Sequence, residues 1–309
     1  MLNYASTLSV SPGRPATRLR IAQRFQTLLS RIETLPTEVA AGYKHADSVK
    51  ARLAKSFALK KFVVIGSHAR GTAIRASSDV DFFAVISRDD VRWGEGYVRS
   101  STTLDRVRED LSSRFWRTDT ARDGQAIMLN FGSGSAVDVV PAFFWEMGSK
   151  WPIYQMPDGA GGWMPTNPEV HRSYLLRANL ASGGKLRRTV QLLKFWRECR
   201  QPRIPLSSIH LELVLASERV CTGAQTHAQC LASAWQVLAE RACRSLRDPL
   251  QIAGLIPAAK TPAQQEQVLR SVLFARDHAV AALNAEDDGD YQEALRQWNI
   301  IYNGYFPQR

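Results

Sequence analysis

The sequence has few of the features that mark secreted, membrane-spanning or zinc-binding proteins. Only four of its 309 residues are cysteine, and none stands in a CxxC or Cys/His pattern of the zinc type. No apolar run approaches the ~20 residues that span a bilayer, and no N-terminal stretch resembles a signal peptide. Internal repeats and low-complexity tracts are absent too. We therefore expect a cytoplasmic protein without membrane contact, whose cysteines are small core residues.

Acidic residues are fewer than basic ones. The net charge of +11 suggests polyanionic partners, which nucleoside triphosphates or a nucleic acid would satisfy. The basic residues form short groups along the chain, such as Arg197, Arg200 and Arg203, and no dense tail. This pattern favours solvated helix faces over a nucleic acid platform, while a nucleic acid stays open as an allosteric ligand.

The segment from Phe62 to Ile86 places a Gly-Ser turn ahead of an Asp-x-Asp pair. Its first residues, 62–65, predict a short strand that ends at Gly66, where the backbone can approach a phosphate closely. Ser67 adds a hydroxyl, and residues 68–74 suit one or two helical turns. The amides near Gly66 and Ser67 would then lie at a helix N-terminus, where partial positive charge favours a triphosphate.

Two carboxylates open the next predicted strand. After a polar turn at residues 76–78, Asp79 and Asp81 flank Val80, and residues 82–86 are rich in β-branched and aromatic side chains. Residues two apart on a strand share a face, so Asp79 and Asp81 point the same way. Paired carboxylates repel each other unless a cation lies between them. Such oxygen ligands suit magnesium or manganese.

A third carboxylate is expected on a neighbouring strand, because two metal ions need a shared ligand set. Asp138 fits this role within residues 135–140, which follow another predicted strand at 125–131 and a turn at 132–134. We expect Asp138 to ligate one ion and to help deprotonate an attacking hydroxyl, while Asp79 and Asp81 bridge both ions. This arrangement is the one that metal-dependent nucleotidyl transfer requires.

The second half of the chain predicts helices that carry two further polar candidates. Residues 186–196 have an apolar face and a second face that includes Lys194. A single helical lysine is usually solvated. Ser208 precedes the apolar segment 209–216, where an N-cap and a nucleotide contact are equally suitable roles. The acidic run at residues 286–290 predicts a loop between helices, without a metal.

Several of these motifs together resemble the signature of the nucleotidyltransferase superfamily that includes DNA polymerase β. They are Gly66-Ser67, Gly71-Thr72, Ser78-Asp79-Val80-Asp81 and Asp138. More narrowly, nearly the whole chain is similar to bacterial CD-NTases, the relatives of cyclic GMP-AMP synthase. That similarity rests on Gly162-Trp163, Asn167-Pro168, His171, the spaced pair Ser208 and Glu212, and the ending Trp298 with residues 302–307.

The resemblance implies an α/β (α+β) nucleotidyltransferase lobe with a mixed sheet, an α-helical C-terminal lobe and an active site in the cleft between them. We place helices at Pro15–Ile32 and Thr37–Phe57, the catalytic lobe at residues 1–165 and the helical lobe at 166–309. The boundary follows from the Pro- and Gly-rich segment 151–168, which suits a connector. The resemblance also implies that Lys194 reaches the phosphates of a donor nucleotide, and that Gly66, Ser67 and Ser208 contact it.

The function implied is condensation of nucleoside triphosphates into a cyclic di- or trinucleotide second messenger. ATP and/or GTP are the expected substrates, with a pyrimidine nucleotide as an alternative, and two Mg²⁺ (or Mn²⁺) ions are the expected cofactors. By resemblance the enzyme acts in bacterial anti-phage signalling, and its product activates a separate effector protein. Three alternatives stay open: a linear oligonucleotide or poly(A)-type synthase, a nucleotidyltransferase with a non-nucleotide acceptor, and an inactive RNA-binding protein of this fold.

Overall fold

The structure is a computed structural model that describes residues 15–75, 79–132 and 136–308. The predicted polar turn at 76–78, which includes Ser78, and residues 133–135 of the second predicted turn and strand lie outside the described residues. The chain divides into two compact units. The sheet unit comprises residues 32–181 and 245–257, and the helical unit comprises residues 1–31, 182–244 and 258–309.

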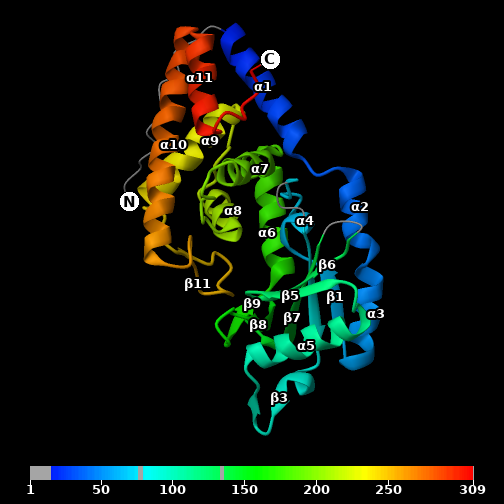
Figure 1. Cartoon of the computed structure of the whole chain (residues 1–309). Coiled ribbons are helices and arrows are strands. Elements are labelled where there is room, and N and C mark those ends of the chain that lie inside the picture. Colours follow the sequence, from blue (N-terminus) through cyan, green and yellow to red (C-terminus); the bar gives the residue numbers. More distant parts are fainter. Residues whose placement is uncertain (1–14, 76–78, 133–135, 309) are drawn as a thin grey trace. The chain divides into compact units, whose positions relative to one another are not determined.

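A mixed sheet of seven strands organises the sheet unit (Figure 1), and this agrees with the predicted fold class. Five of its strands lie side by side in the order β1-β2-β7-β6-β5. The C-terminal part of β7 also pairs with β8, and β8 pairs with β9. Among the strands that the structure describes, only β2 and β7 pair in parallel. The strands are β1 (Lys61–Val64), β2 (Val80–Ile86), β5 (Asp119–Asp123), β6 (Ala126–Asn130), β7 (Val137–Met147), β8 (Pro152–Pro157) and β9 (Trp163–Thr166).

Five α-helices and some short elements complete the sheet unit. The helices are α2 (Pro36–Lys44), α3 (Ala46–Ser56), α4 (Gly66–Arg70), α5 (Ser100–Arg114) and α6 (Pro168–Ala181). The short elements are η1 (Arg88–Val91) and the two-stranded pairs β3 (Arg92–Trp93) with β4 (Gly96–Tyr97) and β10 (Leu246–Arg247) with β11 (Leu255–Ile256).

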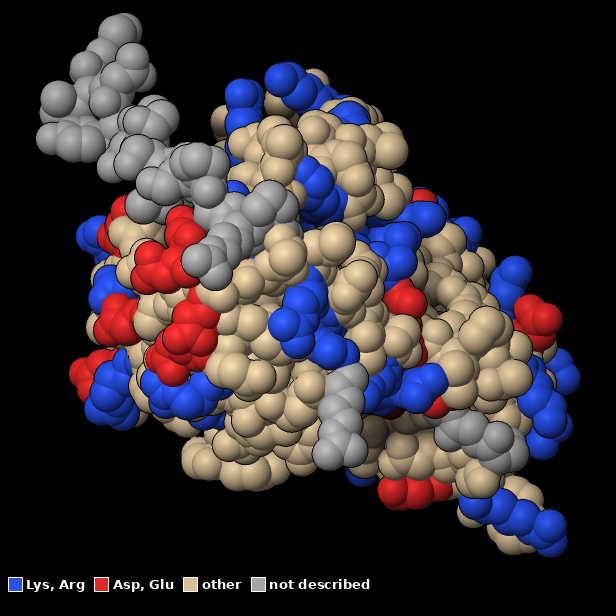
Figure 2. All heavy atoms as spheres, turned by 90° about the horizontal axis from the view of Figure 1, so that it is seen from above, with Lys and Arg blue, Asp and Glu red and all other residues tan. Residues whose placement is uncertain are grey.

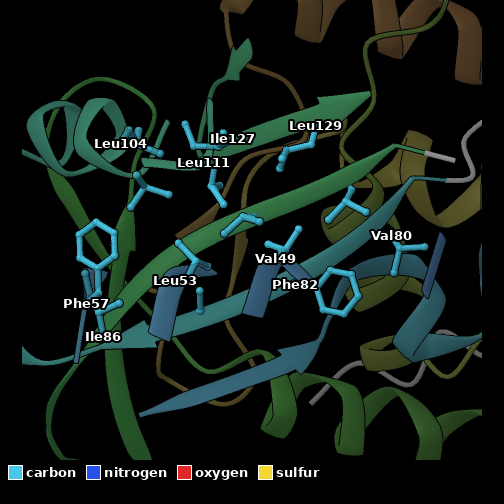
Figure 3. Close-up of a cluster of buried hydrophobic side chains, with 14 of the residues drawn as sticks. Val49, Leu53, Phe57, Val80, Phe82, Ile86, Leu104, Leu111, Ile127 and Leu129 are labelled. Atoms are coloured by element: carbon cyan, nitrogen blue, oxygen red, sulfur yellow. The ribbon is translucent and has the colours of Figure 1, made fainter. Parts of the chain in front are cut away.

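The main core lies on one face of the sheet (Figure 3). Val80, Phe82 and Ile86 of β2 enter it with side chains from α3 and α5, such as Leu53 and Leu104. The intervening residues of β2 point to the other face, because side chains alternate along a strand. That face carries a smaller apolar cluster around Phe83 and Val140. The larger core therefore fixes β2, while the second face of the strand carries Asp81 as well as this smaller cluster.

The helical unit joins the two ends of the described chain. Phe25 of α1 packs edge-on against Trp298 and Phe306, with ring centroids 4.9 and 5.0 Å away. Its helices are α1 (Pro15–Ile32, except its last residue), α7 (Lys185–Glu198), α8 (Ser208–Ser217), α9 (His227–Glu240), α10 (Pro262–Asp288) and α11 (Tyr291–Ile301). The two units thus interleave in sequence, whereas the sequence predicted a single boundary after residue 165. Helices pack where their apolar faces can be buried, and the helices that pack together need not be consecutive in the sequence.

Three local predictions need correction. The helix expected over Thr37–Phe57 is two helices, α2 and α3, separated at His45, whose ring stacks on Phe131 at 3.9 Å. The segment 151–168 contains β8 and β9, and its prolines are tolerated at strand ends and in the edge strand β9. The acidic run is largely helical, because α10 continues to Asp288. The expected helix Pro15–Ile32 is confirmed as α1.

Net charge differs between the two units. The helical unit has 20 Lys and Arg against 11 Asp and Glu, a net of +9, whereas the sheet unit has 20 against 18, a net of +2. Figure 2 shows basic side chains spread over the whole visible face, without a continuous tract.

All four cysteines are buried and form no disulfide, as predicted. None of the described helices combines the length and apolar character that crossing a bilayer requires.

A buried polar contact ties α6 to the loop between β10 and β11. Nε2 of His171 lies 3.1 Å from both carboxylate oxygens of Asp248, and both side chains are buried. The Asp248 carboxylate also accepts hydrogen bonds from the amides of Leu250, Ile252 and Ala253. Burial alone would raise the pKa of Asp248, but these hydrogen bonds outweigh it and hold the pKa well below its usual range.

We expect Asp248→Asn to lower the free energy of unfolding by about 1–3 kcal/mol, because the amide nitrogen cannot accept the hydrogen bonds made to one carboxylate oxygen. Urea unfolding at pH 7 measures this loss, and Asp277→Asn, at an exposed carboxylate, is the control. A lowered native pKa stabilises above the usual pKa of Asp, and that contribution disappears as the pH falls through the native value. The difference between the proteins should therefore shrink in acid, and equal stability at pH 7 would contradict this role.

Candidate active site

The strand register brings two of the predicted carboxylates side by side. Asp81 of β2 pairs directly with Asp138 of β7. Directly opposed residues on neighbouring strands share a face, so both side chains leave the sheet on the side away from the main core. Asp79 immediately precedes β2, and its charge acts on Asp138. The predicted grouping of the three aspartates on one side of the sheet therefore agrees with the geometry.

Gly66 packs directly against Asp81. A Cβ atom added to Gly66 would lie 1.8 Å from Oδ2 of Asp81, and the φ of Gly66 is 65°, in the left-handed region. The close approach to Asp81 and the left-handed φ are two independent reasons why glycine is required at position 66. The preceding residue is also bonded to Asp81, since the backbone amide of Ile65 donates to the carbonyl of Asp81 at 2.8 Å. This hydrogen bond holds the Gly-Ser turn beside the carboxylates.

Helix α4 begins earlier than the sequence predicted. It starts at Gly66 and ends after five residues, at the left-handed Gly71. Ser67 lies in its first turn and is half-buried, and its carbonyl accepts the amide of Thr72 at 2.9 Å. Such a short helix contributes little macrodipole, so any preference for an anion depends on the individual amides of this turn.

The electrostatics of the group fit a cation. Burial, followed by the charges of Asp81, Asp79 and Asp123, raises the pKa of Asp138 to about 7. Burial also raises the pKa of Asp79, although the nearby His68 opposes the rise. Oδ1 of Asp138 is buried, and it has no hydrogen-bond partner among the described residues. A buried carboxylate oxygen without a donor, beside other carboxylates, is a suitable ligand for a hard divalent ion.

The carboxylates are not arranged as a complete ligand set. Within residues 15–75, 79–132 and 136–308, no three His, Cys, Asp or Glu side chains converge closely enough to ligate one ion as they stand. Like charges held at one site repel each other, which favours rotamers that separate the oxygens. The residue types fit Mg²⁺ or Mn²⁺, and ligation would require side-chain rotation without a change in the strands.

The sequence reasoning missed Asp123 and His68, whose charges act at this site. Asp138, Met128 and Ala121 form one row across β7, β6 and β5. Asp123 lies two residues beyond Ala121 and therefore faces the same side as Asp138. The sequence does contain a pattern that predicts β5. Asp123-Gly124 is a dipeptide typical of hairpin turns, and it stands just before a predicted strand, so a partner strand is expected just ahead of it.

Lys194 and Ser208 lie in the helical unit, Lys194 on α7 and Ser208 at the start of α8. Lys194 is 3% exposed, and its Nζ lies 2.9 Å from Oε1 of Glu212. Lys194 is therefore not a solvated lysine.

Ser208 begins α8, but the N-cap is Ser207, whose hydroxyl accepts a hydrogen bond from the amide of His210. Ser208 instead accepts a hydrogen bond from Arg197 at 2.9 Å.

We expect Asp138→Asn to stabilise the metal-free protein at pH 8 by about 1–3 kcal/mol. With a native pKa of about 7, Asp138 keeps its proton between pH 4 and 7 while the unfolded chain has released it. Stability therefore falls as the pH rises through this range, and the full cost is present above pH 7. The amide removes that cost, so the gain should vanish near pH 4.

Thermal unfolding in EDTA at pH 4 and pH 8 measures this dependence. Asp105→Asn, at a half-exposed carboxylate of the same unit, is the control and should show no comparable change with pH. A variant at position 138 that is less stable than the unmodified protein at pH 8 would exclude this account.

Comparison with known proteins agrees with this geometry. The family described as Second Messenger Oligonucleotide or Dinucleotide Synthetase domain matches residues 19–179, more than half of the chain. A Bacillus cereus protein named "Probable cyclic nucleotide synthase" is 21% identical over 295 residues, covering 85% of this chain and 87% of the relative. A cyclic AMP-AMP-AMP synthase of an Acinetobacter strain is 24% identical over 320 residues, covering 93% of this chain and 85% of the relative.

A solved structure shows the same fold. The Escherichia coli protein CdnC, determined with ATP, matches with a TM-score of 0.74 at 18% identity, and the match covers 93% of this chain and 98% of that chain. The predicted combination of a mixed-sheet lobe and a helical region is thereby confirmed. The chain belongs to the family of second-messenger oligonucleotide or dinucleotide synthetases, as its resemblance to the CD-NTases of the polymerase β-like superfamily predicted, and it is a nucleotidyltransferase that makes cyclic oligonucleotides.

Proposed function

We propose that the protein condenses nucleoside triphosphates into a cyclic di- or trinucleotide and releases pyrophosphate, with Asp79, Asp81 and Asp138 as its metal-binding and catalytic residues. The direct pairing of Asp81 with Asp138, beside the glycine that Asp81 requires at position 66, is the observation that carries this proposal. Two Mg²⁺ or Mn²⁺ ions held by these carboxylates would neutralise phosphate charge and stabilise the attacking and leaving oxygens.

The residues of this chain supply position and charge. The amides of Gly66 and Ser67 hold phosphate oxygens of the donor, and Lys194 and Ser208 contact the same nucleotide. Asp138 accepts the proton of the attacking ribose hydroxyl once a neighbouring positive charge favours its ionised form. Catalysis of this kind consists mainly of alignment and charge stabilisation.

ATP is the first substrate to test. The Acinetobacter relative is a cyclic AMP-AMP-AMP synthase, and the E. coli CdnC structure was determined with ATP. GTP and pyrimidine nucleotides are the next candidates, because no residue that reads a base is identified. We further propose that the product acts in bacterial defence against phage by activating a separate effector protein.

The test is to incubate the purified chain with the four labelled nucleoside triphosphates and Mg²⁺ or Mn²⁺, treat the products with phosphatase, and identify them by mass. A phosphatase-resistant product that lacks terminal phosphates supports a cyclic oligonucleotide and names its bases. Products with a phosphatase-sensitive 5′ end would assign a linear synthase instead. Consumption of nucleotide only with an added non-nucleotide acceptor would assign a different transferase.

Asp79→Asn and Asp81→Asn should each lower turnover by on the order of 10³-fold or more, because each removes a charge that the proposed ion site needs. Unfolding temperatures should not fall, since removing one of several like charges relieves repulsion. Steady-state product formation at saturating Mg²⁺ measures the effect, with Asp105→Asn as the control. Substantial activity in either variant would remove these residues from the catalytic set.

Gly66→Ala should lower kcat at least ~100-fold, because its Cβ would lie 1.8 Å from Oδ2 of Asp81 and the carboxylate would have to move. Gly94→Ala is a matched control: Gly94 has a φ of 61°, similar to the 65° of Gly66, but nothing lies within 4 Å of an added Cβ. Both variants place an alanine at a similar left-handed φ, so the Gly94 variant shows how much such a substitution costs the protein without a contact to Asp81. Equal loss of kcat in the two variants would show that strain alone is responsible.

A further inference from the structure

Two polar contacts connect α7 to α8 in the interior of the helical unit. Lys194 and Arg197, one helical turn apart on α7, contact Glu212 and Ser208, one turn apart on α8. The four residues form a two-rung polar ladder. Lys194, Arg197 and Glu212 are all at most 5% exposed, whereas Ser208 is half-buried. Ser208 is thus the member of the ladder that a ligand can most easily reach.

Arg197 determines which hydrogen bond the Ser208 hydroxyl can make. Its Nη1 donates to Oγ of Ser208 at 2.9 Å and to the carbonyl of Leu206 at 2.6 Å. Its Nη2 donates to Glu198 at 2.7 Å, which holds the guanidinium in place. A guanidinium has only donors, so Ser208 must act as the acceptor in this contact. The hydroxyl proton of Ser208 is then left for another acceptor.

That proton has no acceptor in the part of the chain that the structure describes. Ser208 donates no hydrogen bond there, and its neighbour Ser207 already caps α8. Phosphate oxygens at neutral pH are acceptors, so they complement a hydroxyl whose lone pair is already engaged by a cation. A hydrogen bond accepted from an arginine also polarises the hydroxyl and strengthens the bond it donates.

The charge around Ser208 favours an anion as well. Lys194, Arg197 and Arg203 provide three positive charges, whereas Glu198 and Glu212, which pair with them, provide two negative charges. One positive charge of this group is therefore not balanced within it. The helical unit as a whole carries a net charge of +9. Lys194 and Arg197 each have a carboxylate partner, so the surplus charge corresponds to Arg203, whose side chain is 57% exposed and can attract an anion from solvent.

We propose that Arg197 is a positioning residue that directs the hydroxyl proton of Ser208 to a phosphate oxygen of the bound nucleoside triphosphate. The inference rests on the proposed function, in which Ser208 contacts the nucleotide. Arg197 acts through Ser208 and does not itself touch the substrate. The competing explanation is purely structural: Arg197 holds the carbonyl of Leu206 and thereby only shapes the connection between α7 and α8.

A double-mutant cycle with Arg197→Lys and Ser208→Ala separates the two explanations. Each single variant should raise the KM for ATP about tenfold with a smaller change in kcat, because each removes the directed hydrogen bond to a charged phosphate. The double variant should match Ser208→Ala alone, since Arg197 has nothing to direct once the hydroxyl is gone. Effects that multiply, or a KM that does not change, would overturn the proposal.

Three further variants make the result independent of a folding defect. Ser208→Thr keeps the hydroxyl and should recover most of the affinity that Ser208→Ala loses. Ser207→Ala removes the cap and should lower the melting temperature without a change in KM. Arg296→Lys, in an exposed arginine–carboxylate pair of the same unit, controls for the conservative change of Arg to Lys. If Arg197→Lys fails to fold, an unchanged KM in Ser208→Ala is still sufficient to overturn the proposal.

A binding assay distinguishes failure of this inference from failure of the proposed function. The shift in melting temperature caused by a non-hydrolysable ATP analogue is measured for the same variants, and it should fall for Arg197→Lys and Ser208→Ala alike. An unmodified protein that neither binds the analogue nor consumes any nucleotide would overturn the proposed function and this inference together. Normal turnover with multiplying effects in the cycle would overturn the inference alone.

Discussion

The site of this enzyme depends on one unfavourable interaction, the confinement of like-charged carboxylates on a single face of a sheet. Direct pairing of Asp81 with Asp138 across two parallel strands leaves neither side chain free to move far from the other. The cost appears in the raised pKa of Asp138 and in its buried oxygen, to which none of the described residues donates a hydrogen bond. Other parts of the sheet unit have to supply the stability that this arrangement lacks.

The opposite face of the same strands supplies it. Asp81 lies between Val80 and Phe82 on β2, and these two neighbours enter the main core, so their packing fixes the position of Asp81 on the opposite face. Gly66 adds a second restraint, because its missing side chain leaves room for Asp81 alone. In the helical unit a comparable division occurs on α7, where an apolar face packs into the core and the polar ladder connects to α8.

Local sequence was sufficient to predict the features whose causes are local. The alternation around Asp79 and Asp81, the helix over residues 15–32 and the apolar face of α7 follow from spacing alone, and they agree with the structure. The failures all depend on distant partners. In a Pro-rich segment β8 forms because it pairs with β7, and β9 forms because it pairs with β8. Lys194 is buried because Glu212 lies opposite, and Asp123 joins the aspartates through strand register. Tertiary pairing of this kind overrides propensity, and a single sequence does not display it.

The interleaving of the two units also bears on how the chain is made. Synthesis proceeds from the N-terminus, and all described residues of the sheet unit have been added once residue 257 is in place. Helix α1 precedes the sheet unit in the chain, yet the aromatic rings that pack on Phe25 belong to Trp298 and Phe306, more than 250 residues later. The side chain of Phe25 must therefore wait for these partners until the sheet unit has been synthesised, so the helical unit cannot complete its packing before the sheet unit is made.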